Sequence, residues 1–423
     1  MKKIFFLFGL TSTLNAFMVR VGSKTIAINN LFLFCLIAVI LIRGKIFAKK
    51  NNQIIKWLMF AVILLISSFI AVLSNNSLAY DSISISVKYA LIIVLFLFFM
   101  NDEQIKDNAE GFYTGLYWSI IIQMIWAYAQ YGLHFLNINL NDVVFNQIMK
   151  VNANPFSQLA SWGYAYRATG LSWEPANLAI CMCFGYYMTD KIQIKIGMLI
   201  ALLLSGSRAG IVAFATSLLI TTLYNLLQQN KKTRAKIFKW IVLVVGLCIL
   251  MVILIKKTNY GDVVTSNIRR MSAVLNGGDS SSSRHLEYYI RMPEYLDKVD
   301  TISEFFGCGT FISGQNISRY LNIYTYLTDT TWNPESDLVT ILVGNGIIGV
   351  ILYLSILLSS FIYNFRKKRI CNSQMIFVIL ISGILYLYLR STWILVLELF
   401  LTLVKSDLKQ YSNIKGKQVY NER

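Results

Sequence analysis

Acidic and basic side chains placed just before apolar segments are the residues of this chain best suited to chemistry. In Arg-Ala-Thr-Gly-Leu-Ser-Trp-Glu-Pro, Glu174 and Pro175 stand at the start of an apolar run, seven residues after Arg167. Proline is tolerated in the first turn of a helix, and the helix dipole favours a carboxylate there. Glu174 is therefore either a helix-start residue or an acid–base group, and Arg167 is either its ion-pair partner or an anion ligand.

A second pair of carboxylates stands in a similar setting, in Trp-Asn-Pro-Glu-Ser-Asp before a long apolar run. We expect Asn333 to cap a helix whose first position is Pro334, with Glu335 and Asp337 in its first turn. Acids and arginines gathered at one membrane face suit acid–base work on a substrate with a large anionic group.

Arg208 lies in the small-residue segment Ser-Gly-Ser-Arg-Ala-Gly. About ten apolar residues separate Lys195 from Ser205, which is roughly 15 Å of helix. If this helix crosses a membrane, Arg208 lies near the level of the lipid headgroups. An arginine there is costly unless it has a partner, which makes Arg208 a functional candidate. The alternative is that its side chain extends to the membrane surface.

Further arginines lie in the long polar segment at 256–334, which precedes the C-terminal apolar runs. The segment DVVTSNIRRMSAVL predicts a short helix, and Ser283 is expected to cap a second helix that ends at Pro293. Arg284 and Arg291 share one face of that helix. This face is either simply solvated above the membrane or a set of anion ligands.

The composition indicates the setting in which these residues work. Of the 423 residues, 56% are hydrophobic and only 14% are charged, whereas a soluble domain carries about 25% charged residues. The net charge of +18 does not indicate a nucleic-acid partner, because the basic residues form clusters between apolar stretches. The chain is therefore neither an ordinary soluble enzyme nor a disordered protein.

Apolar runs of membrane-spanning length predict an all-α integral membrane protein. A bilayer core of about 30 Å needs about 20 helical residues, which gives about 12 transmembrane helices in this chain, with a range of 10–14. The expected spans are 4–21, 27–42, 57–74, 82–100, 111–133, 173–189, 194–207, 209–227, 239–255, 335–363, 373–389 and 391–405. A secretory signal peptide is the alternative for the first of them.

The basic clusters KIFAKK, KKTRAK and RKKR all fall on one side of this map, which predicts that both termini are cytoplasmic. The expected organisation is N-terminal spans in 1–133, a long outer loop at 134–172, spans in 173–255, a second long outer loop at 256–334, C-terminal spans in 335–405 and a tail at 406–423. Long outer loops in such a protein usually carry its function. A P-loop, a G-x-G-x-x-G and a metal-spaced His/Cys set are absent from the sequence, so we expect neither cofactor nor metal.

Four motifs taken in order resemble the O-antigen polymerase/ligase superfamily. They are RATGLSWEP, SGSRAG, the Arg284 helix followed by FGCG, and NPES followed by GNGIIG, and they cover about 160–355. The resemblance implies a bacterial inner-membrane enzyme of GT-C-like architecture, with a periplasmic active site in two functional loops. It implies a Wzy-type polymerase that transfers a growing glycan from undecaprenyl pyrophosphate to a lipid-linked repeat unit, and a chain-length regulator is a further candidate partner.

The same resemblance assigns roles to the candidate residues. Arg208 would bind the pyrophosphate, with Arg167, Arg284, Arg291 and Asn333 as further substrate ligands. Arginine suits this because its planar fork binds phosphate in bidentate fashion. The base would be Glu335 or Glu174, with Asp337 third.

Two other functions remain open from the sequence. The superfamily's ligases, which transfer polymer to lipid A-core, carry His-Asn before the last large apolar run, and this chain has Trp332-Asn333 there. That difference favours the polymerase. A lipid-linked oligosaccharide flippase or other transporter is the second alternative, although we find no internal repeat of the kind that transporters often show.

Overall fold

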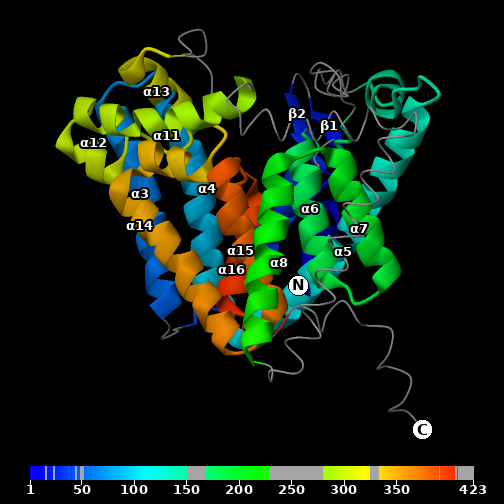
Figure 1. Ribbon diagram of the computed structural model, residues 1–423. Coiled ribbons are helices and arrows are strands. Elements are labelled where there is room, and N and C mark those ends of the chain that lie inside the picture. The colour runs from blue at the N-terminus through cyan, green and yellow to red at the C-terminus, as the bar shows by residue number, and fades with distance from the viewer. Residues whose placement is uncertain are drawn as a thin grey trace.

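The computed structural model is almost entirely helical over the residues that it describes (Figure 1). These residues are 1–14, 17–21, 24–42, 45–47, 52–150, 167–172, 174–228, 280–323, 333–389, 391–404 and 407. The expected span 239–255 and the expected helix in DVVTSNIRRMSAVL lie outside the described residues.

The first part of the chain forms five helices and a hairpin. These elements are α1 (Lys2–Thr11), β1 (Met18–Val21), β2 (Lys24–Ala27), α2 (Ile28–Ile42), α3 (Asn52–Leu73), α4 (Ala79–Phe98) and α5 (Asp102–His134). The expected first span, 4–21, is wrong as a single helix, because α1 ends at Thr11 and β1 pairs antiparallel with β2. Val19 faces Ile26 in this ladder, and β-branched residues of that kind prefer strands.

The remainder of the described chain continues as helices. They are the π-helix η1 (Asp142–Ile148), α6 (Pro175–Met188), α7 (Ile192–Ser205), α8 (Arg208–Gln228), α11 (Ser280–Lys298), α12 (Thr301–Phe306), α13 (Ser313–Leu321), α14 (Asp337–Arg366), α15 (Ile370–Leu385) and α16 (Thr392–Leu403).

Several of these helices suit a membrane. Among the described residues, three helices, α3, α4 and α14, are long and apolar enough to cross one, and α2, α7, the first part of α8, α15 and α16 are shorter apolar helices. Ile55, Met59, Val62 and Phe69 of α3 are exposed although they are apolar. An apolar exposed face of this kind fits lipid rather than water. The structure thus supports an all-α membrane protein, and the count of about 12 spans stays a prediction.

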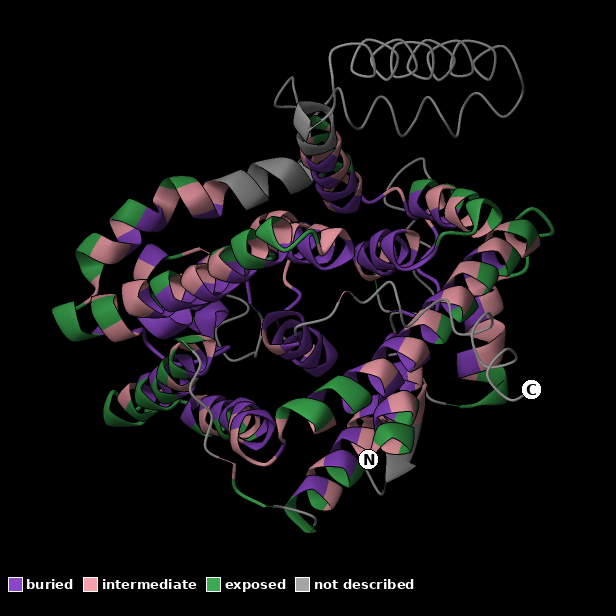
Figure 2. Cartoon of the chain, turned by 90° about the horizontal axis from the view of Figure 1, so that it is seen from below, coloured by how far each residue is buried: buried purple, intermediate pink, exposed green. Residues whose placement is uncertain are grey.

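Figure 2 shows that buried residues face the inside of the bundle and exposed residues face outward. Helix α16 lies in the middle of the bundle, and most of its residues are buried. It contacts α4, α5, α14 and α15. Glu398 of α16 is fully buried, and its Oε1 accepts a hydrogen bond from the Tyr353 hydroxyl of α14 at 2.8 Å. This contact joins α16 to α14 within the buried part of the bundle.

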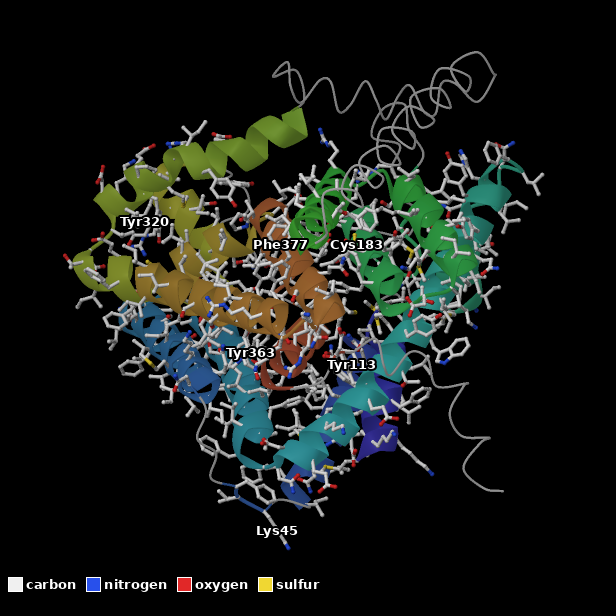
Figure 3. All side chains as sticks on the ribbon, turned by 60° about the horizontal axis from the view of Figure 1, so that its bottom comes forward. Lys45, Tyr113, Cys183, Tyr320, Tyr363 and Phe377 are labelled. Atoms are coloured by element: carbon white, nitrogen blue, oxygen red, sulfur yellow. The ribbon has the colours of Figure 1, made fainter. Side chains whose placement is uncertain are left out.

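Helices α11, α12 and α13 form a cap over α3 and α14 at one end of the bundle, which we call the upper face (Figure 1). Lys45 projects from the opposite side of the molecule (Figure 3). Both expected ends of this helix, the cap at Ser283 and the end at Pro293, are wrong, because α11 runs from Ser280 through both residues to Lys298. Met292 and Tyr295, on either side of the proline, are buried in one apolar cluster with α13 and α14, and this packing outweighs the lost backbone hydrogen bond.

We predict that Tyr353→Phe lowers the free energy of unfolding by about 1–3 kcal/mol, because the buried Glu398 carboxyl group loses its tyrosine partner. Thermal unfolding of the purified protein in detergent measures the change. Tyr363→Phe, at an exposed tyrosine further along α14, is the matched control and should have no effect beyond about 0.5 kcal/mol. Equal melting temperatures for the two variants would show that the buried contact contributes no stability.

Candidate active site

Two of the candidate motifs meet at the upper end of α7. The Arg167 Nε donates a hydrogen bond to the carbonyl oxygen of Ser205 at 3.1 Å, and the backbone N–H of Ala168 donates to that of Leu204 at 2.9 Å. The last carbonyls of a helix have no partner within the helix, so they are free to accept these bonds. Arg167 is thereby bound to a residue that stands three positions before Arg208 in the chain.

The segment between α7 and α8 is a tight helix-to-helix turn. Gly206 has a φ of +55°, which ends α7 in the left-handed conformation. The Ser207 hydroxyl then accepts a hydrogen bond from the Gly210 N–H at 3.3 Å and caps α8, whose first residue is Arg208. The helix dipole disfavours a cation at this end, whereas it favours an anion there. Arg208 is therefore not explained by helix stability, and an anionic ligand would be favoured beside it.

Glu174 is the residue that precedes α6, and Pro175 occupies the first turn, as expected. The Glu174 carboxylate makes no capping hydrogen bond to α6. Its side chain is exposed, but protein atoms surround it closely enough to remove much of its hydration. This loss of hydration and the negative charge of Glu335 raise the pKa of Glu174 to about 7, while Arg167 opposes the shift. The structure therefore brings Arg167, Glu174 and Glu335 into one electrostatic group.

The turn between Arg167 and Glu174 is fixed by two buried amides of α5. The Gln130 Oε1 accepts from the N–H groups of Thr169 at 3.1 Å and Gly170 at 3.0 Å, and the Gln123 Oε1 accepts from the Leu171 N–H at 2.7 Å. Neither glutamine was among the residues predicted from the sequence. A signal was available, because two amides seven residues apart in an apolar run lie on the same face of a helix.

The segment before α14 differs from the expectation. Asn333 does not cap the helix, because its Oδ1 accepts from the Ser313 N–H at 3.0 Å and its Nδ2 donates to the Phe311 carbonyl oxygen at 2.9 Å. The cap is Ser336, whose hydroxyl accepts from the Val339 N–H at 3.3 Å, so α14 begins at Asp337. Asn333 thus connects the beginning of α13 to the segment that carries Glu335.

Asp337 is buried, unlike its neighbour Glu335, which is exposed. The Asp337 Oδ1 accepts from the backbone N–H groups of Tyr388 at 2.9 Å and Leu389 at 2.8 Å. These bonds hold the segment between α15 and α16 against the start of α14. The carboxylate therefore has a structural task in the described chain, and a catalytic role for Asp337 stays a prediction.

The FGCG and GNG motifs interlock. Helix α14 is broken at Gly346, which has a φ of +70° and a ψ of −174°. Just before the break, the carbonyl oxygens of Val343 and Gly344 accept from the N–H groups of Cys308 at 3.0 Å and Gly309 at 3.1 Å. A Cβ atom at Gly346 would lie 2.3 Å from the carbonyl carbon of Phe305, so only glycine allows this approach. The interlock fixes the upper part of α14, and with it the segment that carries Glu335.

Helix α11 approaches the same segment. The Tyr289 hydroxyl makes hydrogen bonds with the Ser336 hydroxyl at 2.7 Å and with the Ile384 carbonyl oxygen at 2.5 Å. Arg284 lies five residues before Tyr289 in α11, and its side chain is outside the described part of the chain. The helix that carries Arg284 is thus anchored next to Glu335.

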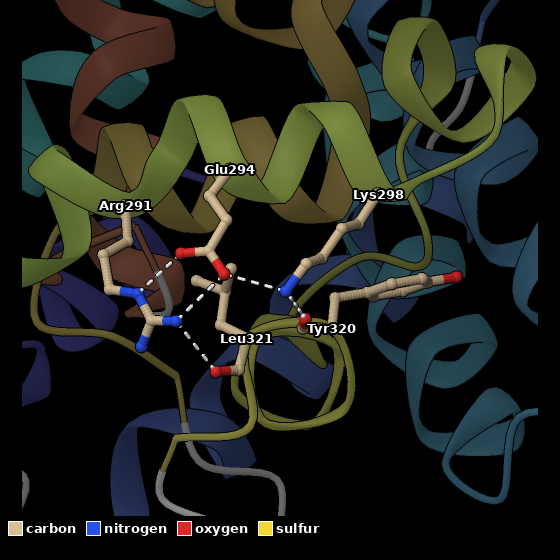
Figure 4. Close-up of polar contacts among 5 residues, drawn as sticks. All are labelled: Arg291, Glu294, Lys298, Tyr320 and Leu321. Carbon is tan, nitrogen blue, oxygen red and sulfur yellow. Dashed lines mark hydrogen bonds and ion pairs between the residues drawn. The ribbon is translucent and has the colours of Figure 1, made fainter.

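Arg291 has protein partners in the described chain (Figure 4). Its guanidinium binds the Glu294 carboxylate through two hydrogen bonds of 2.9 and 3.1 Å, and it also donates to the Leu321 carbonyl oxygen at 3.0 Å. Lys298 binds the same carboxylate at 2.8 Å and the Tyr320 carbonyl oxygen at 3.1 Å. These contacts connect α11 to the end of α13, so substrate binding by Arg291 stays a prediction.

Comparison with known families matches one part of the chain. Residues 194–354, from α7 into α14, match the Wzy_C family model, whose description is O-antigen ligase. None of the curated proteins compared with the chain matches it. The matched region holds Arg208, the α11–α13 cap and Glu335, whereas Arg167 and Glu174 precede it. The match supports the O-antigen polymerase/ligase superfamily and leaves polymerase and ligase as the two candidates within it.

We predict that Gln130→Leu displaces the turn that holds Arg167 and Glu174, because the N–H groups of Thr169 and Gly170 lose their buried acceptor. Leaving such groups unpaired should lower the free energy of unfolding by about 1–3 kcal/mol, and activity should fall together with stability. Thermal unfolding and glycan formation in cells measure the two effects. Gln147→Leu, at an exposed glutamine, is the control, and a Gln130→Leu variant as stable and active as this control would contradict the prediction.

Proposed function

We propose that the protein is a surface-polysaccharide polymerase of the O-antigen polymerase/ligase superfamily. It would transfer a growing glycan from undecaprenyl pyrophosphate to a new lipid-linked repeat unit. The observation that supports this most strongly is the group of Arg167, Glu174 and Glu335 beside the arginine that begins α8. The group combines positive charge for a leaving diphosphate with a carboxylate that can take up a proton.

Arg208 and Arg167 are the proposed ligands of the diphosphate. The start of α8 favours an anion, and the guanidinium groups would add positive charge at the same place. As the bond between the anomeric carbon and the diphosphate oxygen breaks, negative charge grows on the leaving group. Positive groups already fixed in place stabilise that charge most when little water competes with them. Arg284, carried by α11, is the proposed further ligand from the cap.

Glu174 is the proposed general base. The acceptor hydroxyl of the repeat unit would attack the anomeric carbon, and its proton would pass to the Glu174 carboxylate while the lipid diphosphate leaves. A base works best when its pKa is close to the surrounding pH, and the pKa of Glu174 is raised to about 7. Glu335 would then act on the pKa of Glu174 rather than on the substrate. The proposed scheme needs neither a nucleotide nor a metal.

The proposed location is the bacterial inner membrane, with the upper face in the periplasm and both termini in the cytoplasm. The distribution of Lys and Arg along the sequence supports this orientation. The proposed partners are the lipid-linked oligosaccharide, membrane lipid and a chain-length regulator in the same membrane.

The ligase is the second candidate, and the description of the matching family favours it. It would transfer finished polymer to lipid A-core instead of to a repeat unit. Deletion of the gene distinguishes the two. Loss of the polymerase leaves core plus a single repeat unit on the cell surface, whereas loss of the ligase leaves long lipid-linked polymer without attachment to core.

We predict that Arg208→Ala reduces polymer formation at least about 100-fold, since a charge-assisted contact to the leaving group is worth several kcal/mol in the transition state. Arg208→Lys should restore part of the activity, because it keeps the charge and loses the planar fork. The measurement is a gel of surface polysaccharide from a deletion strain that carries each gene, with protein levels from membrane immunoblots.

Arg366→Ala, at an exposed arginine at the far end of α14, is the matched control and should give the wild-type ladder. Long-chain glycan from cells with Arg208→Ala would exclude Arg208 from the site.

We predict that the pH profile of kcat/KM falls on the acid side with a midpoint near 7, because the base must be deprotonated and the pKa of Glu174 is raised to about 7. Glu335→Gln removes the negative charge that raises this pKa, so its midpoint should move to lower pH. Initial rates of purified enzyme at a series of pH values measure both profiles. Complete loss of activity in Glu335→Gln would instead identify Glu335 as the base.

A further inference from the structure

A hollow on the upper face, apart from the group around Glu174, has a volume of about 430 Å³. It lies between the turn that joins α3 to α4 and the helix α13. Asn75, Asn76 and Ser77 line it from the turn. The α13 side contributes Gln315, Ser318, Arg319 and Asn322.

The chemistry of this lining is uniform. Every residue that lines the hollow in the described chain is polar, and most of them carry an amide or a hydroxyl group. Amides and hydroxyls both donate and accept hydrogen bonds, which matches the hydroxyl groups of a sugar. Arg319 adds a cation that can bind the carboxylate of an acidic sugar.

The hollow is held in shape by its own hydrogen bonds. The Gln315 Nε2 donates to the Ser77 hydroxyl at 2.6 Å, which joins α13 to the turn. The Asn76 Nδ2 donates to the Asn316 Oδ1 at 3.3 Å, and the Asn76 Oδ1 accepts from the Leu78 N–H at 2.9 Å. Because these bonds exist without a ligand, binding would need little reordering of the walls.

One buried side-chain oxygen beside the hollow lacks a partner within the described chain. Gln315 is only 7% exposed, and its Oε1 accepts no hydrogen bond within the described chain. A buried carbonyl oxygen without a donor is costly, so such atoms usually bind water or a ligand. Gln315 lines the hollow, and a turn of its side-chain amide would bring this oxygen to the hydroxyl group of a sugar seated there.

The hollow is connected to the candidate active site through α13. The first residue of this helix, Ser313, is bonded to Asn333, which stands two residues before Glu335. A glycan that reacts near Glu335 has further sugar units that must lie along the upper face. Binding energy from such remote units can be used to hold the reacting end in position.

We propose that this hollow is a saccharide subsite that holds units of the growing glycan remote from its reacting end. The proposal rests on the proposed glycosyl transfer, and it adds the place where the polymer is held. Length-dependent binding follows, since a glycan of several repeat units reaches the hollow and a single unit at the reacting centre leaves it empty.

The test uses the full-length protein in lipid nanodiscs and lipid-free glycan of several repeat units, released by mild acid from the strain's own polymer. Isothermal titration gives the Kd for wild type and for the triple variant Asn75→Gly, Arg319→Gln, Asn322→Gly. Asn75 and Asn322 have φ values of +50° and +54°, so glycine removes each amide without straining the backbone. Gln147→Ala, at an exposed amide elsewhere, is the matched control.

We expect the triple variant to raise the Kd at least tenfold at an unchanged melting temperature, while Gln147→Ala binds as wild type does. The triple variant should also make shorter polymer in cells. An equal Kd for wild type and the triple variant, or no binding by wild type, would overturn the subsite. The ladder of the deletion strain judges the proposed polymerase independently, because it does not depend on binding of free glycan.

Discussion

The arrangement of the upper face depends on one contact, between the segment that starts at Arg167 and the last carbonyl groups of α7. Arg167 and Ala168 donate hydrogen bonds to the carbonyl oxygens of Ser205 and Leu204. A further turn of α7 would otherwise have supplied these donors. The same end of α7 leads through Gly206 into the arginine that begins α8. The contact therefore brings two motifs together that lie about 40 residues apart in the chain.

Buried amides and hydroxyls perform the rest of the positioning. Gln123 and Gln130 hold the turn before Glu174, Asn333 connects α13 to the Glu335 segment, and Ser336 caps α14. In an apolar surrounding, each of these groups must find a partner or pay for its lost hydration, so a displaced turn would leave several of them unpaired. The exposed Glu174 carboxylate makes no capping hydrogen bond to α6, which fits a role toward substrate.

Local sequence signals predicted some features well. Pro175 fixed the start of α6, because a proline favours the first helical turn, and the apolar run after residue 335 became α14. The start of α14 was misplaced because the partners of Asn333 are about 20 residues away and invisible in the local pattern. Pro293 stays within α11 for a similar reason, since the packing of Met292 and Tyr295 is tertiary. The sequence predicted which acidic and basic residues would gather at one membrane face. The contact between Arg167 and Ser205 could not be predicted, because the two residues are far apart in the chain.

The most direct test of glycosyl transfer at this face is a reconstitution of the purified protein in lipid vesicles with one substrate, an undecaprenyl-pyrophosphate-linked repeat unit. Mass spectrometry then follows the glycan length and the free lipid diphosphate. We expect lipid-linked glycans of two and more repeat units, with one lipid diphosphate released for each new linkage and without added nucleotide sugar. Repeat units that remain single, but are transferred to lipid A-core when this acceptor is added, would contradict the polymerase and identify a ligase.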